Sequence, residues 1–493
     1  MKTANIVTTF LSHQILPYNR YEFLDCSTNI IPSYHQGTIL HSTYNKDIDV
    51  NSNIKYPLPS SSTATWGGIP ASNTKEKDES SKEKSLPYYL MHHGKAAQFM
   101  QLWPTIVTFT LVKGWKPGML KDFTRAVEEV IHANPILTGF VYSTPNWKAS
   151  GRMEIRIQPG KYLPENHDFV TNIDMSNDTT KFPSPIGLNV TKLLAYVDDH
   201  LTPLIKRSEF VSELIKYRSP LFSIDIVTLP DNYACYVLKM AHCVGDGHTY
   251  YNIMNQISSI LNNQPIKEIN WTHPEIPTHE IYPSTFSQCD IQKSYGLPFM
   301  LGASINLFQL YKQKKGYFVL SKKKIQEKQI DLASNTKNHL TANDIITSAL
   351  CESNLSSEIF AFTRDMRTRR DLRNVGGNFH CEVPFWKHVA IDPNLFHPIV
   401  RKGRYFEKDE LPLLPFLFGR TGKISSLATI EKLIEKKNGG DSMKVVCHCL
   451  PKNFAGNVPL DVAFVTSMDD ECFVVLHNFR EVKVGPLLRD ILM

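Results

Sequence analysis

A histidine and an aspartate stand four residues apart in the glycine-rich stretch HCVGDG, residues 242 to 247. The imidazole of His242 can take up and release a proton near neutral pH, which is what a general base must do. The carboxylate of Asp246 lies about one tight turn away, where it can fix the loop. Gly245 and Gly247 are expected to give the bend the positive φ that it needs. The spacing therefore predicts a histidine base on a loop held by an aspartate.

The residues around this stretch predict the elements that position it. Residues 220–229 and 233–242 read as two strands joined by a Pro-Asp-Asn turn, and the second is largely apolar. Residues 248–261 carry isoleucines at helical spacing. The ends of strands that open into a helix are where α/β proteins place functional groups. His242 is therefore expected at the end of a buried strand, with Asp246 just before a helix.

Other interpretations of the same residues are possible. A histidine at a strand end is often only structural, and His242, Asp246 and His248 could together bind a metal. The metal site is disfavoured because the three do not have helical i, i+4 spacing and no cysteine or histidine cluster completes a ligand set. A serine hydrolase is disfavoured because no G-x-S-x-G occurs, and no glycine-rich phosphate loop is present either.

The length of 493 residues and the texture of the chain predict several parts. Residues 1–85 are rich in Ser, Pro, Asn and Lys and are expected to be a partly disordered N-terminal extension. Strands and helices then alternate over residues 86–284 and again over 285–493, with a proline-rich connection between them. We therefore expect an α/β fold with two similar domains, each a mixed sheet with helices. The last three strands, within residues 444–479, are expected to be antiparallel neighbours.

The composition limits the class of protein. The chain is 42% hydrophobic and 21% charged, which is ordinary for a globular protein, and its net charge of +6 is small for this length. No stretch is apolar and long enough to span a membrane, and the N-terminus lacks the features of a signal peptide. Nine scattered cysteines without a C-x-x-C pair suit reduced thiols. These features predict a cytoplasmic protein.

Four elements, in order, resemble a known superfamily. HCVGDG resembles the H-x-x-x-D-G motif of the chloramphenicol-acetyltransferase-like acyltransferases, which include BAHD enzymes, alcohol acetyltransferases and condensation domains. The other elements are LKDFTRAVEEVIHANPILTGFV (120–141), LTANDIITSAL (340–350), and DMRTRR (365–370) followed by NVGGNF (374–379). The resemblance covers roughly residues 86–493. The doubled histidine of condensation domains is missing, since Ala241 precedes His242, and so is the D-F-G-W-G element of BAHD enzymes.

The resemblance implies an activity and roles for individual residues. It implies a channel between two domains, with His242 as the general base that deprotonates an alcohol or amine attacking an acyl-CoA thioester. Asp246 would pair with an arginine, best matched by Arg367, to lock the loop together with Gly247. Arg364, Arg369, Arg370 and Arg373 are rivals for that pairing. An arginine-rich loop can also be solvated or face nucleic acid, but DMRTRRDLRN has no interleaved aromatic residues.

Further site residues are candidates by position. Asn378 and Thr341 could donate a hydrogen bond to the tetrahedral oxyanion, although both are equally explicable as turn or capping residues. Thr341 followed by Asp344 has the pattern of a helix N-cap. Lys322 and Lys323 could meet the phosphates of CoA, although such lysines are more often solvated surface.

The resemblance implies no permanently bound cofactor and no metal. The partners implied are acyl-CoA as co-substrate and a small-molecule alcohol or amine, with no nucleic acid and no membrane span, and we expect a monomer. Two alternatives stay open: a condensation-type enzyme that takes its acyl group from a carrier protein, and a non-catalytic member of the fold that binds a ligand or protein.

Overall fold

The structure is a computed structural model. It describes residues 89–90, 105–143, 153–156, 169–178, 182–183, 189–205, 220–271, 290, 293–294, 296–309, 312–334, 339–365, 367, 373–407, 409–427, 434–435, 442–455, 459–468 and 471–493. These residues belong to one unit of the chain, which comprises residues 1–12 and 85–493, whereas residues 13–84 form a second unit. The predicted N-terminal extension, residues 1–85, and the predicted boundary at residues 284–285 lie outside the described residues.

The first of two large sheets positions His242. Its strands are β2 (Thr105–Lys113), β5 (Val170–Asp174), β6 (Phe222–Leu229), β7 (Tyr233–Ala241) and β12 (Lys444–Cys449), in the order β12-β2-β7-β6-β5. β5 and β6 run parallel, and the other neighbours run antiparallel. The inner strands β2 and β7 are buried along almost their whole length, and β6 is the third inner strand. Burial on both faces explains why β7 is a nearly continuous apolar run, whereas β2 combines apolar residues with buried threonines.

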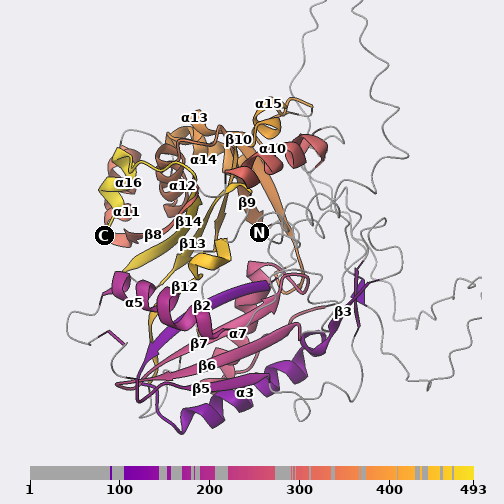
Figure 1. Cartoon of the computed structure of the whole chain (residues 1–493), viewed down its shortest axis with the longest axis vertical. Coiled ribbons are helices and arrows are strands. Elements are labelled where there is room, and N and C mark those ends of the chain that lie inside the picture. The colour runs from indigo at the N-terminus through magenta and orange to yellow at the C-terminus, as the bar shows by residue number, and fades with distance from the viewer. Residues whose placement is uncertain are drawn as a thin grey trace, which may run out of the picture. The chain divides into compact units, whose positions relative to one another are not determined.

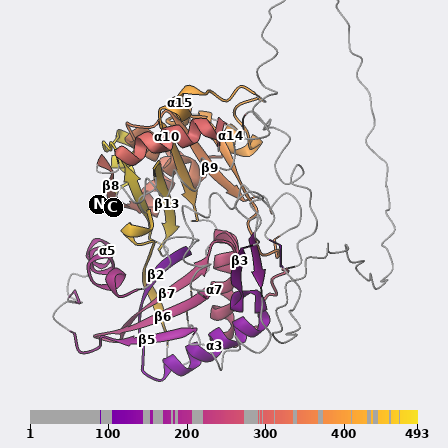
Figure 2. The same cartoon turned by 45° about the vertical axis from the view of Figure 1, so that its right-hand side comes forward.

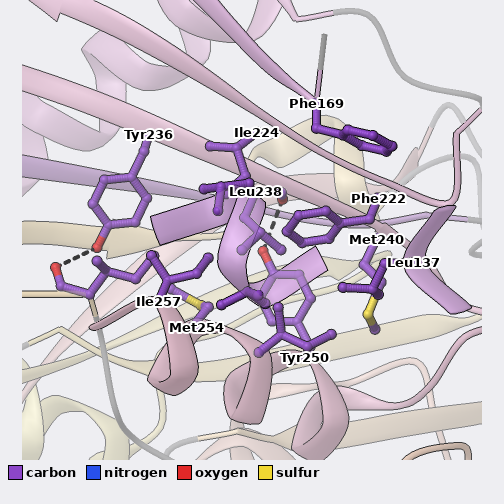
Figure 3. Close-up of a cluster of buried hydrophobic side chains, with 14 of the residues drawn as sticks. Leu137, Phe169, Phe222, Ile224, Tyr236, Leu238, Met240, Tyr250, Met254 and Ile257 are labelled. Atoms are coloured by element: carbon purple, nitrogen blue, oxygen red, sulfur yellow. Dashed lines mark hydrogen bonds between the residues drawn. The ribbon is translucent and has the colours of Figure 1, made fainter. Parts of the chain in front are cut away.

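Two long helices, α3 (Met119–Ala133) and α7 (Gly247–Leu261), cover one face of this sheet (Figures 1 and 2). Figure 3 shows part of the core between these helices and the sheet, with Met254 and Ile257 of α7 packed near Leu238 of β7. The Tyr250 hydroxyl donates a hydrogen bond to the backbone carbonyl of Leu238 at 2.9 Å, so a polar group is satisfied inside the core. This contact ties the first turn of α7 to the strand that leads to His242.

Smaller elements complete the first half. On the other face of the sheet, α5 (Val190–Tyr196), a π-helix (Val197–Leu201) and a 3-10 helix (Thr202–Leu204) follow one another along the chain. A three-stranded sheet has the order β1 (Tyr89–Leu90), β4 (Met153–Arg156), β3 (Phe140–Ser143), and a 3-10 helix (Pro135–Thr138) precedes β3.

The second large sheet is also mixed. Its order is β10 (His380–Trp386), β9 (Ile359–Asp365), β11 (Thr421–Ser426), β13 (Asp461–Ser467), β14 (Cys472–Phe479), β8 (Lys314–Ser321). β11 runs parallel to both β9 and β13, and the remaining pairs are antiparallel. The helices of this half are α10 (Leu297–Phe308), α11 (Lys322–Ser334), α12 (Ala342–Ser353), α13 (Lys387–Ala390), α14 (Pro393–Lys402), α15 (Leu414–Leu417), α16 (Pro486–Ile491) and a 3-10 helix (Lys452–Ala455). One apolar core lies between this sheet and the helices α12, α14 and α16. The predicted α/β fold with two mixed sheets and helices is therefore confirmed.

One strand lies in a different sheet from the one expected. β13 and β14 are antiparallel neighbours, as predicted, but β12 pairs with β2 in the first sheet rather than with β13. The alternating residues of β12 fit the first sheet. Cys447 and Cys449 pack in an apolar cluster with Phe109, while His448 points to the other side of the sheet and is hydrogen-bonded to Thr110. The two sheets are thus not built from two consecutive halves of the sequence.

No helix among the described residues combines the length and the apolar character needed to cross a bilayer.

Candidate functional site

The HCVGDG stretch forms a bend between β7 and α7. β7 ends at Ala241, and α7 begins at Gly247. Asp246 is the N-cap of this helix, because its side chain accepts a hydrogen bond from the backbone N–H of Thr249 at 3.2 Å. Since Asp246 caps the helix, its position relative to His242 is fixed by the start of α7.

The glycines of the bend serve a different purpose from the one predicted. Neither Gly245 nor Gly247 has a positive φ. A Cβ added at Gly245 would instead come within 2.5 Å of the Cβ of Thr249, and a Cβ at Gly247 would come within 2.4 Å of the end of the Leu427 side chain. The prediction of positive φ is therefore wrong. Glycine is needed at Gly245 because the chain passes close to the base of the Thr249 side chain, whereas at Gly247 the end of the Leu427 side chain can shift.

A buried ion pair stands behind the bend. Asp246 and Arg367 form two hydrogen bonds, from Nη1 to Oδ2 at 2.9 Å and from Nη2 to Oδ1 at 3.0 Å. The side chain of Arg367 is fully buried, and Asp246 as a whole is 6% exposed. Burial alone would raise the pKa of Asp246, but the charge and hydrogen bonds of Arg367 outweigh it and hold that pKa well below its usual value. Asp246 is therefore a carboxylate at every physiological pH.

The remaining donors and acceptors of this pair are also satisfied. Arg367 donates to the backbone carbonyls of Gly377 at 2.6 Å and Val375 at 2.9 Å, and Asp246 accepts from the backbone N–H of Phe379 at 2.9 Å. A buried ion pair is stable when its other hydrogen-bonding groups find partners in this way. Because Asp246 precedes α7 while Arg367 follows β9, the network connects the two large sheets just behind His242.

His242 lies at the accessible side of this network. It is partly exposed, and the Nδ2 amide of Asn378 donates to its backbone carbonyl at 2.9 Å. Desolvation is the main cause that lowers the pKa of His242 below its usual value, and the charge of Lys423 lowers it too. The backbone carbonyl of His242 itself and the charge of Asp246 act in the opposite direction. The imidazole is therefore neutral at neutral pH, which is the form that can accept a proton.

Polar residues that belong to no sequence motif also lie near His242. The ring centroid of His380, the first residue of β10, is 6.4 Å from that of His242. Lys423 on β11 contacts Glu382 on β10, Nζ to Oε1, at 2.5 Å. A signal was present in HCEVPFW, where polar His380 and Glu382 alternate with apolar residues at the period of a strand. It was overlooked because the nearness of β10 and β11 to His242 is visible only in three dimensions.

The three residues considered as metal ligands have separate partners. Asp246 pairs with Arg367, while His248 Nδ1 lies 3.2 Å from Asp365 Oδ2 and its Nε2 lies 3.0 Å from the carbonyl of Arg373. Within the described part of the chain, no group of three histidine, cysteine or acidic side chains is arranged to hold a metal ion. The side-chain hydrogen bond to Asp365 raises the pKa of His248, although desolvation opposes it. His248 is thus engaged in the connection between the two sheets.

The two candidate oxyanion donors have different surroundings. Thr341 is the N-cap of α12 in a capping box with Asp344, as its sequence pattern indicated, and its hydroxyl donates to Asp344 Oδ2 at 2.8 Å. Its proton is therefore committed to the cap. Asn378 lies against the backbone of His242 and has a second amide proton beyond the one that it donates there. The structure thus places Asn378 against the bend, while the hydroxyl of Thr341 is engaged in the cap of α12.

The lysines considered for CoA lie elsewhere. Lys322 begins α11, directly after β8, and its Nζ donates to Ser467 Oγ at 2.6 Å. Lys323 is exposed and lies 3.9 Å from Glu327. β8 and β10 are opposite edges of the six-stranded sheet, which are separated by roughly 24 Å at a strand spacing of about 4.8 Å. The structure does not bring these two lysines to the bend that carries His242.

Among the arginines considered as partners of Asp246, Arg364 instead donates to the carbonyl of Val400 at 2.9 Å. Arg369 and Arg370 lie outside the described residues. The structure therefore places Arg367 against Asp246 and gives Arg364 a different partner.

Comparison with known proteins identifies the fold. The structure resembles F. graminearum TRI101 complexed with coenzyme A and deoxynivalenol, with a TM-score of 0.53 at 12% identity, over 80% of this chain and 95% of that one. It resembles F. sporotrichioides TRI101 complexed with coenzyme A and T-2, with a TM-score of 0.52 at 12% identity, over 77% and 92%. The condensation domain of the Monacolin K polyketide synthase MokA matches with a TM-score of 0.51 at 12% identity, over 82% and 95%.

No family model matches the sequence, and no curated protein matches it significantly. The likeness therefore lies in the structure: the chain has the fold of the TRI101 structures and of the MokA condensation domain, which is the chloramphenicol-acetyltransferase-like fold.

Proposed function

We propose that this protein is an acyltransferase that moves an acyl group from acyl-CoA to a hydroxyl or amine of a small molecule, with His242 as the general base. The observation that carries the proposal is the buried Asp246–Arg367 pair, which fixes the bend that carries the partly exposed His242, with its neutral imidazole, at the end of β7. Solved proteins of the same fold include TRI101, which binds coenzyme A together with deoxynivalenol or T-2. We infer a comparable pair of substrates, a thioester and a hydroxylated acceptor.

The chemistry follows from the neutral imidazole. A ring nitrogen of His242 takes the proton from the acceptor as its oxygen or nitrogen bonds to the thioester carbonyl carbon. The tetrahedral intermediate then collapses, the C–S bond breaks, and the imidazolium returns the proton to the leaving thiolate. General base catalysis of this kind typically contributes about 100- to 10,000-fold to the rate. Asn378, with an amide proton to spare, is the candidate donor to the oxyanion.

Asp246 and Arg367 are positioning residues in this proposal. Both oxygens of Asp246 are occupied by Arg367 and backbone N–H groups, so the carboxylate has no need to contact substrate. Gly247 supports the same bend, since a side chain there would meet Leu427. These residues set the orientation of His242 and take no part in bond making.

A carrier-protein thioester is the second candidate donor. The observation that favours it is the likeness to the MokA condensation domain, which is as close as that to TRI101. An enzyme of that kind would release a thiol from an acylated carrier protein and not from free acyl-CoA.

The test is thiol release by the full chain from a panel of acyl-CoA esters with alcohol and amine acceptors. We expect acceptor-dependent release by the wild type and a loss of at least about 100-fold in His242→Ala. His132→Ala, which removes an exposed histidine from the last turn of α3, is the matched control and should keep full activity. Circular dichroism and thermal melting should be the same for all three proteins. Full turnover by His242→Ala would exclude His242 as the base, and release only from carrier-bound thioester would favour the second candidate.

A further inference from the structure

One face of the second sheet carries a group of polar side chains close to His242. We call it the polar patch, and it consists of Thr363, His380, Glu382 and Lys423. Glu382 and Thr363 are directly opposite one another on β10 and β9, and Lys423 is opposite Ala361, two residues from Thr363. Because alternate residues of a strand share a face, the register places all four side chains on the same side of the sheet.

The opposite face of the same strands is apolar. Phe360 and Phe362 of β9 and Val383 of β10 are buried in the core beneath the helices. The polar patch is therefore not part of that core, and core packing does not explain why these positions are polar. All four of its residues are partly exposed.

The polar patch lies next to the proposed base. The rings of His380 and His242 have centroids 6.4 Å apart. The charge of Lys423 contributes to the lowered pKa of both histidines, although desolvation is the larger cause, so Lys423 lies within electrostatic reach of each ring. A molecule that reacts at His242 would therefore also meet the patch.

Several polar atoms in this region lack a partner. The buried Nδ1 of His380 and Oγ1 of Thr363 make no hydrogen bond, and neither do Nδ1 of His242 and Oδ1 of Asn378. Buried polar atoms without partners are unfavourable and rare in folded proteins. Their concentration at one place, beside a candidate base, indicates hydrogen-bonding groups that are kept for a ligand.

We propose that the polar patch binds the acceptor, and that the acceptor carries a second, uncharged hydrogen-bonding group, such as a hydroxyl, besides the one that is acylated. This inference rests on the proposed function and specifies the substrate class of the same site. The second group would accept from or donate to His380 and Thr363 while the first lies at His242.

The charges of the patch favour an uncharged acceptor. The ammonium of Lys423 and the carboxylate of Glu382 are both mostly buried, and their contact at 2.5 Å cancels their charges. His380 adds no charge, because desolvation lowers its pKa to about 4. An ionic group on the acceptor would find no net opposite charge here and would lose its hydration. Polyhydroxylated neutral molecules fit the patch, whereas simple aliphatic alcohols leave its polar atoms unpaired.

The experiment compares matched acceptors with the full chain and acetyl-CoA. The probes are cyclohexanol against the cyclohexanediols and octanol against the octanediols, so that each pair differs by one hydroxyl. We expect the wild type to favour at least one diol over its mono-ol by about tenfold or more in kcat/KM, since sites built to bind a hydroxyl discriminate against its absence. Thr363→Val and His380→Phe should reduce this preference about tenfold, chiefly by raising KM for the diol.

Two kinds of control keep the result interpretable. Thr171→Val, at an exposed position of β5, and His477→Phe, on β14, repeat the same substitutions elsewhere and should keep the preference. Thr363→Ser retains the hydroxyl and should keep it as well. A wild type that transfers acetyl groups without favouring any diol, or variants that keep the full preference, would overturn the inference and leave the proposed function intact. No thiol release with any acceptor, from acetyl-CoA or from any other ester of the acyl-CoA panel, would instead overturn the proposed function, and the inference with it.

Discussion

At the scale of single residues, the buried pair of Asp246 and Arg367 gives the sharpest prediction. Asp246→Asn would leave the fully buried guanidinium of Arg367 without its counter-charge. Removing one partner of a buried ion pair typically costs about 3–5 kcal/mol of stability. We therefore expect a lower urea midpoint and a lower melting temperature, together with a loss of activity.

Two further variants separate this effect from others. Asp199→Asn, at an exposed aspartate of the π-helix, should leave the free energy of unfolding unchanged. The double variant Asp246→Asn with Arg367→Met should recover part of the loss, because no unpaired charge is then buried. If Asp246→Asn lost activity at unchanged stability, the aspartate would act on the reaction and not on the fold.

Lys423 provides a prediction for the pH dependence of the rate. Its positive charge helps to lower the pKa of His242, after desolvation, so removing that charge should raise the pKa. The double variant Lys423→Met with Glu382→Gln avoids leaving a buried carboxylate unpaired. Because the base must be neutral, the acid limb of log kcat/KM against pH should move to higher pH. An unmoved limb would show that Lys423 does not act on His242, whatever happens to the size of kcat/KM.

The sequence was informative about some residues of the site and not about others. His242, Asp246 and Arg367 could be selected because their types and spacing follow a motif, and the structure brings the last two together. His380 and Lys423 could not, since their importance comes from the distance between strands that are far apart in sequence. The lysines at 322 and 323 illustrate another limit: their charge is visible in the sequence, but their distance from the bend that carries His242 is not.

At the scale of elements, the bend between β7 and α7 depends on close approach. Gly245→Ala would place a methyl group about 2.5 Å from the Thr249 side chain, which itself contacts Asp246 and Gly377. Overpacking of this kind costs about 1–3 kcal/mol. Gly118→Ala is the matched control, because a Cβ there would meet nothing within 4 Å. Thermal melting should show a lower melting temperature for Gly245→Ala than for Gly118→Ala. Equal melting temperatures for the two variants would contradict the close-approach explanation.

The elements themselves were easier to predict than their partners. The apolar periodicity of α3 and α7 and the alternation in β12 are local signals that a reader can see in the sequence. Which strand β12 would join is decided by shape and by single contacts, such as the bond from His448 to Thr110. A local pattern contains no information about a contact between residues that are 338 positions apart.

At the scale of the whole molecule, buried histidines couple stability to pH. Desolvation lowers the pKa of His448 to about 3, and it lowers the pKa of His380 and of His477 to about 4. An unfolded histidine has a pKa of about 6.5. The unfolded chain therefore binds more protons than the folded one below that pH, so stability is complete above about pH 6.5 and falls as the pH drops toward the folded values.

His477→Phe tests one of these groups. The ring of His477 stacks on Phe318 with centroids 4.4 Å apart, and phenylalanine can keep that stacking. The wild type should lose up to about 3 kcal/mol between pH 7 and pH 4 because of this group, and the variant should lose correspondingly less. Urea unfolding at several pH values measures the difference, and an identical slope of stability against pH would refute the coupling.

The fold could be predicted at this scale because strands and helices alternate in a recognisable order over most of the chain. This chain is only 12% identical in sequence to the solved structures of the same fold, so the same order of strands and helices can be built from very different residues. What the order could not give was the assignment of strands to sheets, since the register that joins β2 to β12 spans more than 300 residues.

The pairing of β12 with β2, which are far apart in sequence, has a consequence for synthesis on the ribosome. Until residue 449 has been translated, β2 is the outermost strand of its sheet, nine residues long and rich in β-branched residues, with its backbone groups open to pairing. A nascent or truncated chain ending at residue 284 should therefore aggregate, and supplying residues 285–493 in the same cell should restore its solubility. Because β12 completes the sheet of the N-terminal half, we expect the native state to form only after most of the chain has been translated.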